Sequence, residues 1–324
     1  MVRSEDAGRG NAGGPAVNPL EQNAEFLPFH RDELAAQDLA GQRAGRAAIR
    51  PFMIDQHRAF FAGLPYLFTA TVDEGGWPVA SVLAGTPGFV HTPDATTLRI
   101  GAAYRADDPA ATALAVGGQV GLLGLDLSNR RRNRANGHLA AVDCGGLTVH
   151  IAQSFGNCAQ YIQTRRPAAI ARTKRPAERL DGLDAEARAL IEASDTFFVA
   201  SQSRPQAGRD GGLDMSHRGG RPGFVGVNGS SLAIPDFRGN GFFNTLGNLL
   251  GDPRAGLLFI DFAAGDLLQL QGRVTIDWHP DGGPGGAERL WRVEVERGWR
   301  RRGVFPFSWI FDAYAPTTLR MGTW

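Results

Sequence analysis

The segment Ser216-His217-Arg218-Gly219-Gly220-Arg221-Pro222-Gly223-Phe224-Val225 matches an earlier one, Ser81-Val82-Leu83-Ala84-Gly85-Thr86-Pro87-Gly88-Phe89-Val90, which sets Ser216 against Ser81. The same spacing places Gly121–Leu127 against Gly256–Phe262. Solenoid repeats are about 20–50 residues long. The spacing between Ser81 and Ser216 is much longer than that, which indicates that a whole domain is duplicated.

Upstream of this match the spacing between the copies is shorter. Leu67-Phe68-Thr69-Ala70-Thr71 corresponds to Phe197-Phe198-Val199-Ala200-Ser201, so Phe198 stands against Phe68. The second copy has therefore gained residues between this strand and the next, and the sequence predicts an insertion within Ser203–Gly212.

Length and composition indicate a globular protein of two domains. The chain has 324 residues, is 43% hydrophobic, and balances 34 basic against 33 acidic residues. This balance argues against a general nucleic-acid binder, and no apolar stretch approaches the roughly 20 residues that cross a bilayer. Two cysteines, Cys144 and Cys158, form neither a disulfide framework nor a four-ligand zinc site. We expect no nucleic-acid or membrane partner, and no metal site.

Each copy shows the same coarse order of elements. A short amphipathic helix, Asp55–Gly63 or Asp184–Ser194, precedes a run of short strands, and Asn244–Leu250 forms a further helix in the second copy. Short strands separated by turn signals, with few helices, are typical of an antiparallel barrel. The predicted strands are 67–71, 78–83, 97–101, 119–127, 137–142 and 147–153 in the first copy, and 197–201, 213–218, 231–234, 255–261, 267–277 and 291–296 in the second.

The repeat and the composition together predict the domain boundaries. Residues 1–25 are rich in Gly, Asn and Ala and lack the apolar core of a signal peptide, so we expect a disordered head on a cytoplasmic protein. The first domain is expected over 26–166, a basic linker with two prolines over 167–182, and the second domain over 183–324.

Three features resemble the pyridoxamine 5′-phosphate oxidase-like flavoproteins: the strand and turn Ser216–Val225, the strand end Ile234–Asp236, and the helix and strand Asn244–Phe259. The resemblance covers both halves after about Phe26 and is strongest in the second. It implies a mainly β (α+β) fold of two tandem six-stranded antiparallel split β-barrels with short helices. It also implies that FMN binds at the junction of two barrels. Because both barrels lie in one chain here, we expect an intramolecular pseudo-dimer.

The second copy has residues suited to a flavin phosphate, which needs cationic side chains and several hydrogen-bond donors. Arg218 and Arg238 supply charge, and Asn240, Asn244 and Thr245 lie around a helix start. Alternatively, Arg218 pairs with a carboxylate and the other residues only cap the helix. In the first copy, Leu83, Pro109 and Ala110 replace Arg218, Asn244 and Thr245. We therefore expect one FMN per chain.

The first copy has polar residues of its own that could complete this site. The run Arg130–Arg134 is placed in a turn, where it clamps a phosphate, binds nucleic acid or is simply solvated. Gln153–Ile162 resembles a family ending that reaches the partner barrel. The remaining candidate cofactor-binding residues are Arg131, Arg134, Gln153, Ser154 and Asn157, with Ser216, His217, Gly219 and Gln271 of the second copy.

His217 is the candidate for a catalytic residue, because a histidine beside a flavin could hydrogen-bond the ring or act as an acid. Its side chain could equally point away, since neighbours on a strand face opposite sides. A basic and aromatic stretch, Arg300–Phe311, either stacks on a planar substrate or packs in the core.

The leading hypothesis is an FMN-dependent oxidoreductase acting on a small-molecule substrate at the junction of the two barrels, with a separate reductase or a nicotinamide as electron donor. The alternatives are a non-catalytic flavin-binding or electron-relay protein, or the same barrel holding haem or a deazaflavin. Self-association of the whole chain into a homodimer is also possible.

Overall fold

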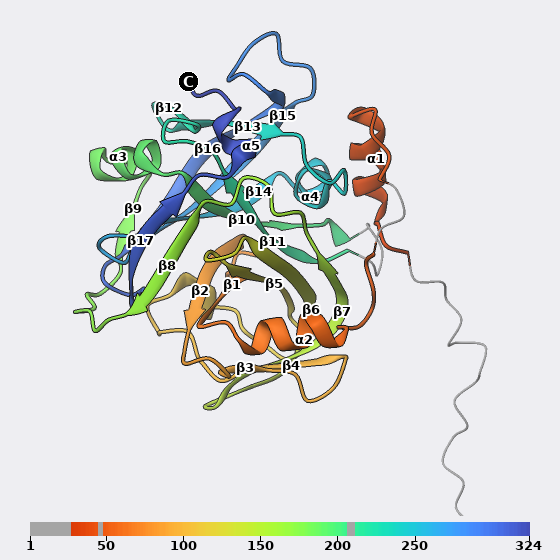
Figure 1. The fold of residues 1–324 in the computed structure, drawn as a ribbon, viewed down its shortest axis with the longest axis vertical. Coiled ribbons are helices and arrows are strands. Elements are labelled where there is room, and N and C mark those ends of the chain that lie inside the picture. The colour runs from red at the N-terminus through yellow and green to blue at the C-terminus, as the bar shows by residue number, and fades with distance from the viewer. Residues whose placement is uncertain (1–26, 45–47, 206–210) are drawn as a thin grey trace, which may run out of the picture.

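The computed structural model describes residues 27–44, 48–205 and 211–324, so the predicted disordered head lies outside the described residues. The chain is mainly β, and the two copies of the repeat form two antiparallel sheets. In Figure 1 the first sheet occupies the lower part of the molecule and the second sheet the upper part.

The duplication is visible in the strand order. The first sheet runs β2-β1-β5-β6-β7-β4-β3 and the second β11-β10-β14-β15-β16-β13-β12, so each position has its counterpart. Each path contains seven strands where six were predicted, and among the described residues its two end strands are not paired with each other. The sheets are therefore open. The additional strand in each copy is a short one at the end of the path, Val90–His91 or Gly226–Asn228, which pairs with the following strand.

The strand bounds follow the repeat. In the first sheet they are β1 (Tyr66–Val72), β2 (Pro78–Ala84), β3 (Val90–His91), β4 (Thr97–Ile100), β5 (Gln119–Asp126), β6 (Arg131–Asp143) and β7 (Gly146–Gly156). In the second they are β10 (Thr196–Gln202), β11 (Leu213–Gly219), β12 (Gly226–Asn228), β13 (Ser231–Phe237), β14 (Arg254–Asp261), β15 (Asp266–Asp277) and β16 (Ala287–Arg301).

The described helices are short, and the helix Asn244–Gly251 is buried at six of its eight residues. The described helices are α1 (Arg31–Leu39), α2 (Asp55–Ala62), α3 (Ala185–Ala193), α4 (Asn244–Gly251) and α5 (Pro316–Leu319), with a 3₁₀ turn, η2, at Pro109–Ala111. Phe60 and Phe61 of α2 join the core of the first half, and Leu246 and Leu249 of α4 join the core of the second. The helices predicted from apolar spacing are α2, α3 and α4, whereas α1 was not anticipated.

The insertion in the second copy lies where the repeat places it. The β1–β2 connection spans residues 73–77, between the paired residues Val72 and Pro78. The β10–β11 connection spans residues 203–212, between Gln202 and Leu213, and residues 206–210 of it lie outside the described part.

The two halves pack against each other through equivalent residues. The rings of Phe68 and Phe198, which are counterparts in the repeat, stack with centroids 3.7 Å apart. A Cβ on Gly121 would lie 2.7 Å from the carbonyl oxygen of Leu213, and one on the counterpart Gly256 would clash in the same way with Pro78. A shared apolar cluster surrounds these contacts, including Ala70, Val82, Leu123, Met215 and Leu258. Equivalent residues of the two copies therefore meet across this contact.

The predicted linker, residues 167–182, makes strand pairings with the second half. β8 (Thr164–Ala169) enters it and pairs with β17 (Phe307–Ala313), and β9 (Glu178–Leu180) pairs with β16. The segment between the halves is thus fixed by backbone hydrogen bonds along part of its length.

One prediction about the first copy is wrong. The arginine run was placed in a turn, but β6 begins at Arg131 and pairs with β5 from Asp126 onward. Only Arg130, whose φ is 62°, remains in the turn. The turn itself is built by Asp126, which accepts hydrogen bonds from Ser128 and Asn129. Side chains from Arg131 onward therefore alternate between the two faces of the strand.

Candidate functional site

A cleft lies at the junction of the two halves and takes its walls from both. β6 and the segment after β7 come from the first half, and β11, the end of β13 and the start of α4 come from the second. Its enclosed volume is about 100 Å³. Among the described residues, four guanidinium groups line it, those of Arg132, Arg134, Arg218 and Arg289. Three of the four are paired with the carboxylates of Asp214, Asp236 and Glu288. This excess of positive charge suits an anion. We call this cleft the arginine cleft.

Arg134 is the most enclosed of these arginines, with 8% of its surface exposed. Its Nη1 donates to Asp214 Oδ1 (3.2 Å) and to Asn244 Oδ1 (3.1 Å), and its Nη2 donates to Ser216 Oγ. Its Nε is buried and has no hydrogen-bond partner. Burial lowers the pKa of Arg134, an effect that nearby Asp214 opposes.

Arg132 has no carboxylate partner among the described residues. Its Nε donates to the Cys158 carbonyl oxygen (2.8 Å), and its Nη1 lies 3.3 Å from Nδ1 of His217. Burial and the neighbouring guanidinium groups of Arg132 and Arg218 lower the pKa of His217 well below its ordinary value, so its ring is neutral at pH 7. With Nδ1 accepting from Arg132, the proton sits on Nε2, which is buried and unpartnered. The cleft thus holds a spare donor as well as spare charge.

Arg218 and Arg289 share the one carboxylate of the cleft. Arg218 Nη1 donates to Asp236 Oδ1 and Arg289 Nε donates to Asp236 Oδ2, each at 2.8 Å. The pairing of Arg218 with a carboxylate is the alternative that the sequence left open, but here the carboxylate itself lines the cleft. Arg218 also keeps a buried Nε without a partner.

The N-terminus of α4 opens onto the arginine cleft. Its first residues, Asn244, Thr245 and Leu246, line the cleft. Phe243 occupies the cap position with a φ of 58° and supplies no side-chain cap. Free N-terminal amides and the helix dipole favour an anion at such a position. Thr245 Oγ1 donates to Ser216 Oγ (2.8 Å), which ties the helix to β11.

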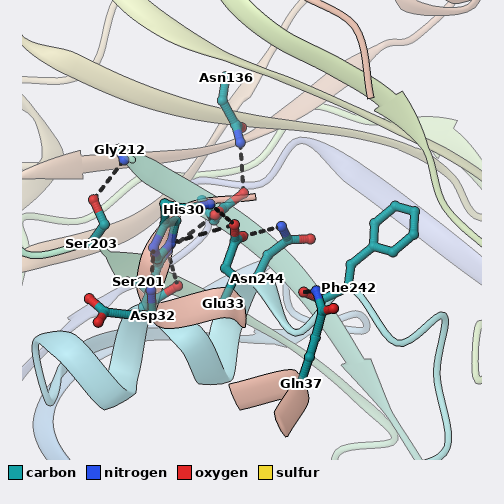
Figure 2. Close-up of polar contacts among 12 residues, drawn as sticks. His30, Asp32, Glu33, Gln37, Asn136, Ser201, Ser203, Gly212, Phe242 and Asn244 are labelled. Atoms are coloured by element: carbon teal, nitrogen blue, oxygen red, sulfur yellow. Dashed lines mark hydrogen bonds and ion pairs between the residues drawn. The ribbon is translucent and has the colours of Figure 1, made fainter. Parts of the chain in front are cut away.

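A buried polar network lies behind the cleft and includes α1. Glu33 accepts hydrogen bonds from the side chain of Asn244 and from the backbone of His30 (2.9 Å). Figure 2 shows Glu33 and Asn244 facing each other. Asn136 belongs to the same network and donates to Asp214 Oδ1 (2.6 Å). Burial and the nearby carboxylate of Asp214 raise the pKa of Glu33 to about 8, so it is largely protonated at pH 7. Glu33 therefore does not neutralise the arginines of the cleft.

The equivalent junction on the other side of the molecule holds a buried carboxylate. Asp108 occupies it, accepting from Ser81 Oγ (2.6 Å), Arg301 Nη1 (2.6 Å) and Gln269 Nε2 (3.1 Å). Ser81 is the counterpart of Ser216, and Gln269 is the counterpart of Arg134. Leu83, the counterpart of Arg218, is packed in the apolar core. An internal carboxylate thus pairs with the cation at this junction.

The structure brings together most, but not all, of the predicted cofactor-binding residues. Those that line the arginine cleft are Ser216, His217, Arg218, Gly219, Asn240, Asn244, Thr245, Arg134 and Asn157. Gly219 has a packing role as well, because a Cβ there would collide with the carbonyl oxygen of Tyr161. Asn157 keeps a buried, unpartnered Oδ1.

The other five predicted residues lie elsewhere. Arg131 stacks over Phe60, 4.9 Å from the ring centroid, on the opposite face of β6. Ser154 contacts His57 Nδ1 (3.0 Å), and Gln153 borders a separate cavity. Arg238 is exposed and only its carbonyl group takes part, accepting from Tyr161 Oη (3.0 Å). Gln271 lies at the other junction and donates to the Pro78 carbonyl oxygen (3.1 Å).

Sequence reasoning missed two groups that shape the cleft. Arg132 had a usable signal, since strand alternation places it on the same face as Arg134. Arg289 and the α1 residues had none, because only folding brings them beside α4 and β13.

The described residues contain no helix long and apolar enough to cross a membrane. They also contain no cluster of three or more His, Cys, Asp or Glu side chains arranged to hold a metal ion.

Comparisons with known proteins leave the family open. No family model matches the chain, and no curated protein matches it. Among solved structures, HupZ from Group A Streptococcus is similar over 41% of this chain and 98% of its own, at 12% identity and a TM-score of 0.28. The haem storage protein HutZ from Vibrio cholerae is similar over 37% and 95%, at 12% identity and a TM-score of 0.27. A FAD-binding protein from Mesorhizobium loti is similar over 39% of this chain and 97% of its own, at 12% identity and a TM-score of 0.27. Similarities this weak establish no function.

Proposed function

We propose that the arginine cleft binds the phosphate group of one FMN molecule per chain, and that the protein is an FMN-dependent oxidoreductase acting on a small molecule. The observation that carries the proposal is the gathering of Arg132, Arg134 and Arg218 at an uncapped helix N-terminus, with three buried donor atoms lacking partners. Buried polar atoms are rarely left unpaired without a reason. A phosphate group supplies the acceptors they lack.

The residues of the cleft fit the phosphate end of the cofactor. Ser216, Asn244 and Thr245 surround the arginines with further polar groups, and His217 Nε2 can donate. The enclosed volume of about 100 Å³ is smaller than the roughly 300–1,000 Å³ usual for a whole small-molecule site. The proposal therefore assigns only the phosphate group to the enclosed part. A bound flavin would supply the hydride or electron transfer, and the protein would supply binding and orientation.

The adjacent pair Arg131 and Arg132 provides the test. Arg132→Met should weaken FMN binding by about 1.5–3 kcal/mol, the range for hydrogen bonds to charged groups, because it removes a guanidinium that lines the cleft. No carboxylate is left unpaired, so the variant should fold. Arg131→Met is the matched control and should bind FMN like the natural chain, since Arg131 faces away from the cleft. Fluorescence quenching of FMN during titration measures both affinities.

The same titration separates the proposal from its competitors. Equal effects of the two substitutions would remove the arginine cleft as the phosphate site. The absorption spectrum of the purified protein distinguishes flavin from haem or a deazaflavin. Reduction of bound FMN by a nicotinamide or by a separate reductase, followed by turnover of a substrate, would favour an enzyme over a passive flavin-binding or electron-relay protein.

A further inference from the structure

A second cavity lies beneath α3, away from the arginine cleft. Its volume is about 470 Å³, within the usual range for small-molecule sites. The walls come from α3, the start of β10, the end of β14 and the start of β15. Leu190, Ile260, Phe262 and Leu267 make much of its lining apolar.

Three polar residues that line this cavity are almost fully buried. Arg165 is 7% exposed, Asp195 6% and Thr196 1%. Each has one polar atom with no hydrogen-bond partner: Nη1 of Arg165, Oδ1 of Asp195 and Oγ1 of Thr196. Unpaired buried groups are costly, and three at one cavity require an explanation.

The guanidinium and the carboxylate are held in place by their other contacts. Arg165 Nη2 donates to Asp195 Oδ2, and the guanidinium lies over the ring of Phe262, 4.2 Å from its centroid. The backbone carbonyl of Asp195 accepts from Gly220 N (3.0 Å), which anchors it to the strand end beside the arginine cleft. The ion pair thus leaves one donor and one acceptor unused on two fixed groups.

The charge of this cavity differs from that of the arginine cleft. Four carboxylates line it, those of Glu186, Asp195, Asp261 and Asp266, against the guanidinium groups of Arg165 and Arg300. A phosphate or carboxylate ligand is therefore disfavoured here. A neutral ligand with one acceptor and one donor on the same edge matches Arg165 Nη1 and Asp195 Oδ1.

We propose that the cavity beneath α3 is a second binding site, which takes a neutral planar carboxamide or a heterocycle with the same donor and acceptor edge. Arg165 donates to the carbonyl oxygen of the ligand, Asp195 accepts from its N–H, and the hydroxyl of Thr196 adds a third contact. The apolar walls receive the ring. This site does not depend on FMN binding at the arginine cleft.

Benzamide and benzoate are the probes, because they differ only in the group that meets Arg165 and Asp195. Saturation-transfer NMR and titration on the full chain should show benzamide binding at least about tenfold more tightly than benzoate, which lacks the donor and carries a charge. Failure of benzamide to bind, or benzoate binding as tightly, would overturn the proposal.

Two substitutions on α3 locate the binding. Leu190→Trp fills the cavity and should abolish benzamide binding. Glu192→Trp places the same ring on the same helix at an exposed residue that does not line the cavity, and should leave binding unchanged. Equal binding by both variants would place benzamide elsewhere and overturn the proposal.

Thr196→Val tests the site without a bulky side chain. The hydroxyl of Thr196 makes no hydrogen bond in the protein, so its loss should leave the melting temperature unchanged or raise it. Benzamide binding should nevertheless weaken by about threefold or more. An unchanged affinity would remove Thr196 from the site, and with it the explanation of its unpaired hydroxyl.

Discussion

Single side chains in this protein take their roles from the face of the strand on which they lie. Arg131 and Arg132 are adjacent and chemically identical, yet one stacks on Phe60 and the other lines the arginine cleft. The same alternation puts Arg134 beside Asn244 and Ser216. Charge in a sequence run therefore says little until its strand register is known.

The buried carboxyl of Glu33 predicts a pH dependence of stability. Its pKa is raised from 4.5 to about 8 by burial and by Asp214. The folded protein thus keeps a proton that the unfolded chain releases near its ordinary pKa. Between these two values stability should fall as pH rises, by up to about 1.4 kcal/mol per pH unit.

Glu33→Gln should remove this contribution. Urea unfolding of both proteins between pH 5 and pH 8 measures the slopes, and the difference between them isolates the contribution of one proton. A constant difference in the free energy of unfolding between the two proteins is compatible with the prediction, because an amide accepts fewer hydrogen bonds than a carboxyl group. Parallel curves would mean that Glu33 is ionised in the folded protein.

Among the elements, α4 connects the cleft to the N-terminal helix. Its N-terminus faces the arginines, and its side, at Gly247, lies directly against the backbone of Glu33 in α1. His30 Nε2 also contacts Asn248 Oδ1 (2.9 Å) across the same interface. The position of α1 thus depends on the absence of a side chain at Gly247.

Gly247→Ala should destabilise the protein by about 1–3 kcal/mol, as overpacked sites do. In an open helix this substitution stabilises by about 1 kcal/mol, but here the new Cβ would lie 2.6 Å from Glu33 Cα. Gly63→Ala, at the exposed end of α2 with its nearest contact at 3.7 Å, is the control and should be neutral or slightly stabilising. Denaturant unfolding compares them, and a stabilising Gly247→Ala would show that α1 yields easily.

At the scale of the whole molecule, the duplicated halves meet at two equivalent junctions that carry different residues. One keeps Arg134, Ser216 and an eight-residue helix. The other has Gln269, Ser81 and a three-residue 3₁₀ turn, with Asp108 and Arg301 paired inside it. The two-fold contact of Phe68 with Phe198 persists between them.

This asymmetry predicts one FMN per chain. Absorbance of the cofactor released on denaturation, set against the protein concentration, should give a ratio near one. Leu83→Ala, at the counterpart of Arg218, should lower stability by about 2–5 kcal/mol and leave the ratio unchanged, because Leu83 packs in the core. A ratio near two would mean that the junction that holds Asp108 also binds a ligand.

The sequence by itself determined the duplication, the site of the insertion, most strand positions and the replacement of Arg218, Asn244 and Thr245 by apolar counterparts in the first copy. These features follow from local patterns: the spacing between Ser81 and Ser216, the apolar runs and turn residues, and the correspondence of Arg218 with Leu83 in the repeat.

Only the tertiary structure decided which arginines meet and what surrounds them. Arg134 and Asn244, or Glu33 and Asn244, are far apart in the chain and carry no pattern that pairs them. Strand register places Arg132, and not Arg131, on the face of β6 that lines the arginine cleft. The packing of α1 buries Glu33 beside Asp214. Such contacts form only when apolar burial brings the sheets and helices together. The charge and hydrogen-bonding groups of a side chain determine neither the register of its strand nor which distant residue it contacts.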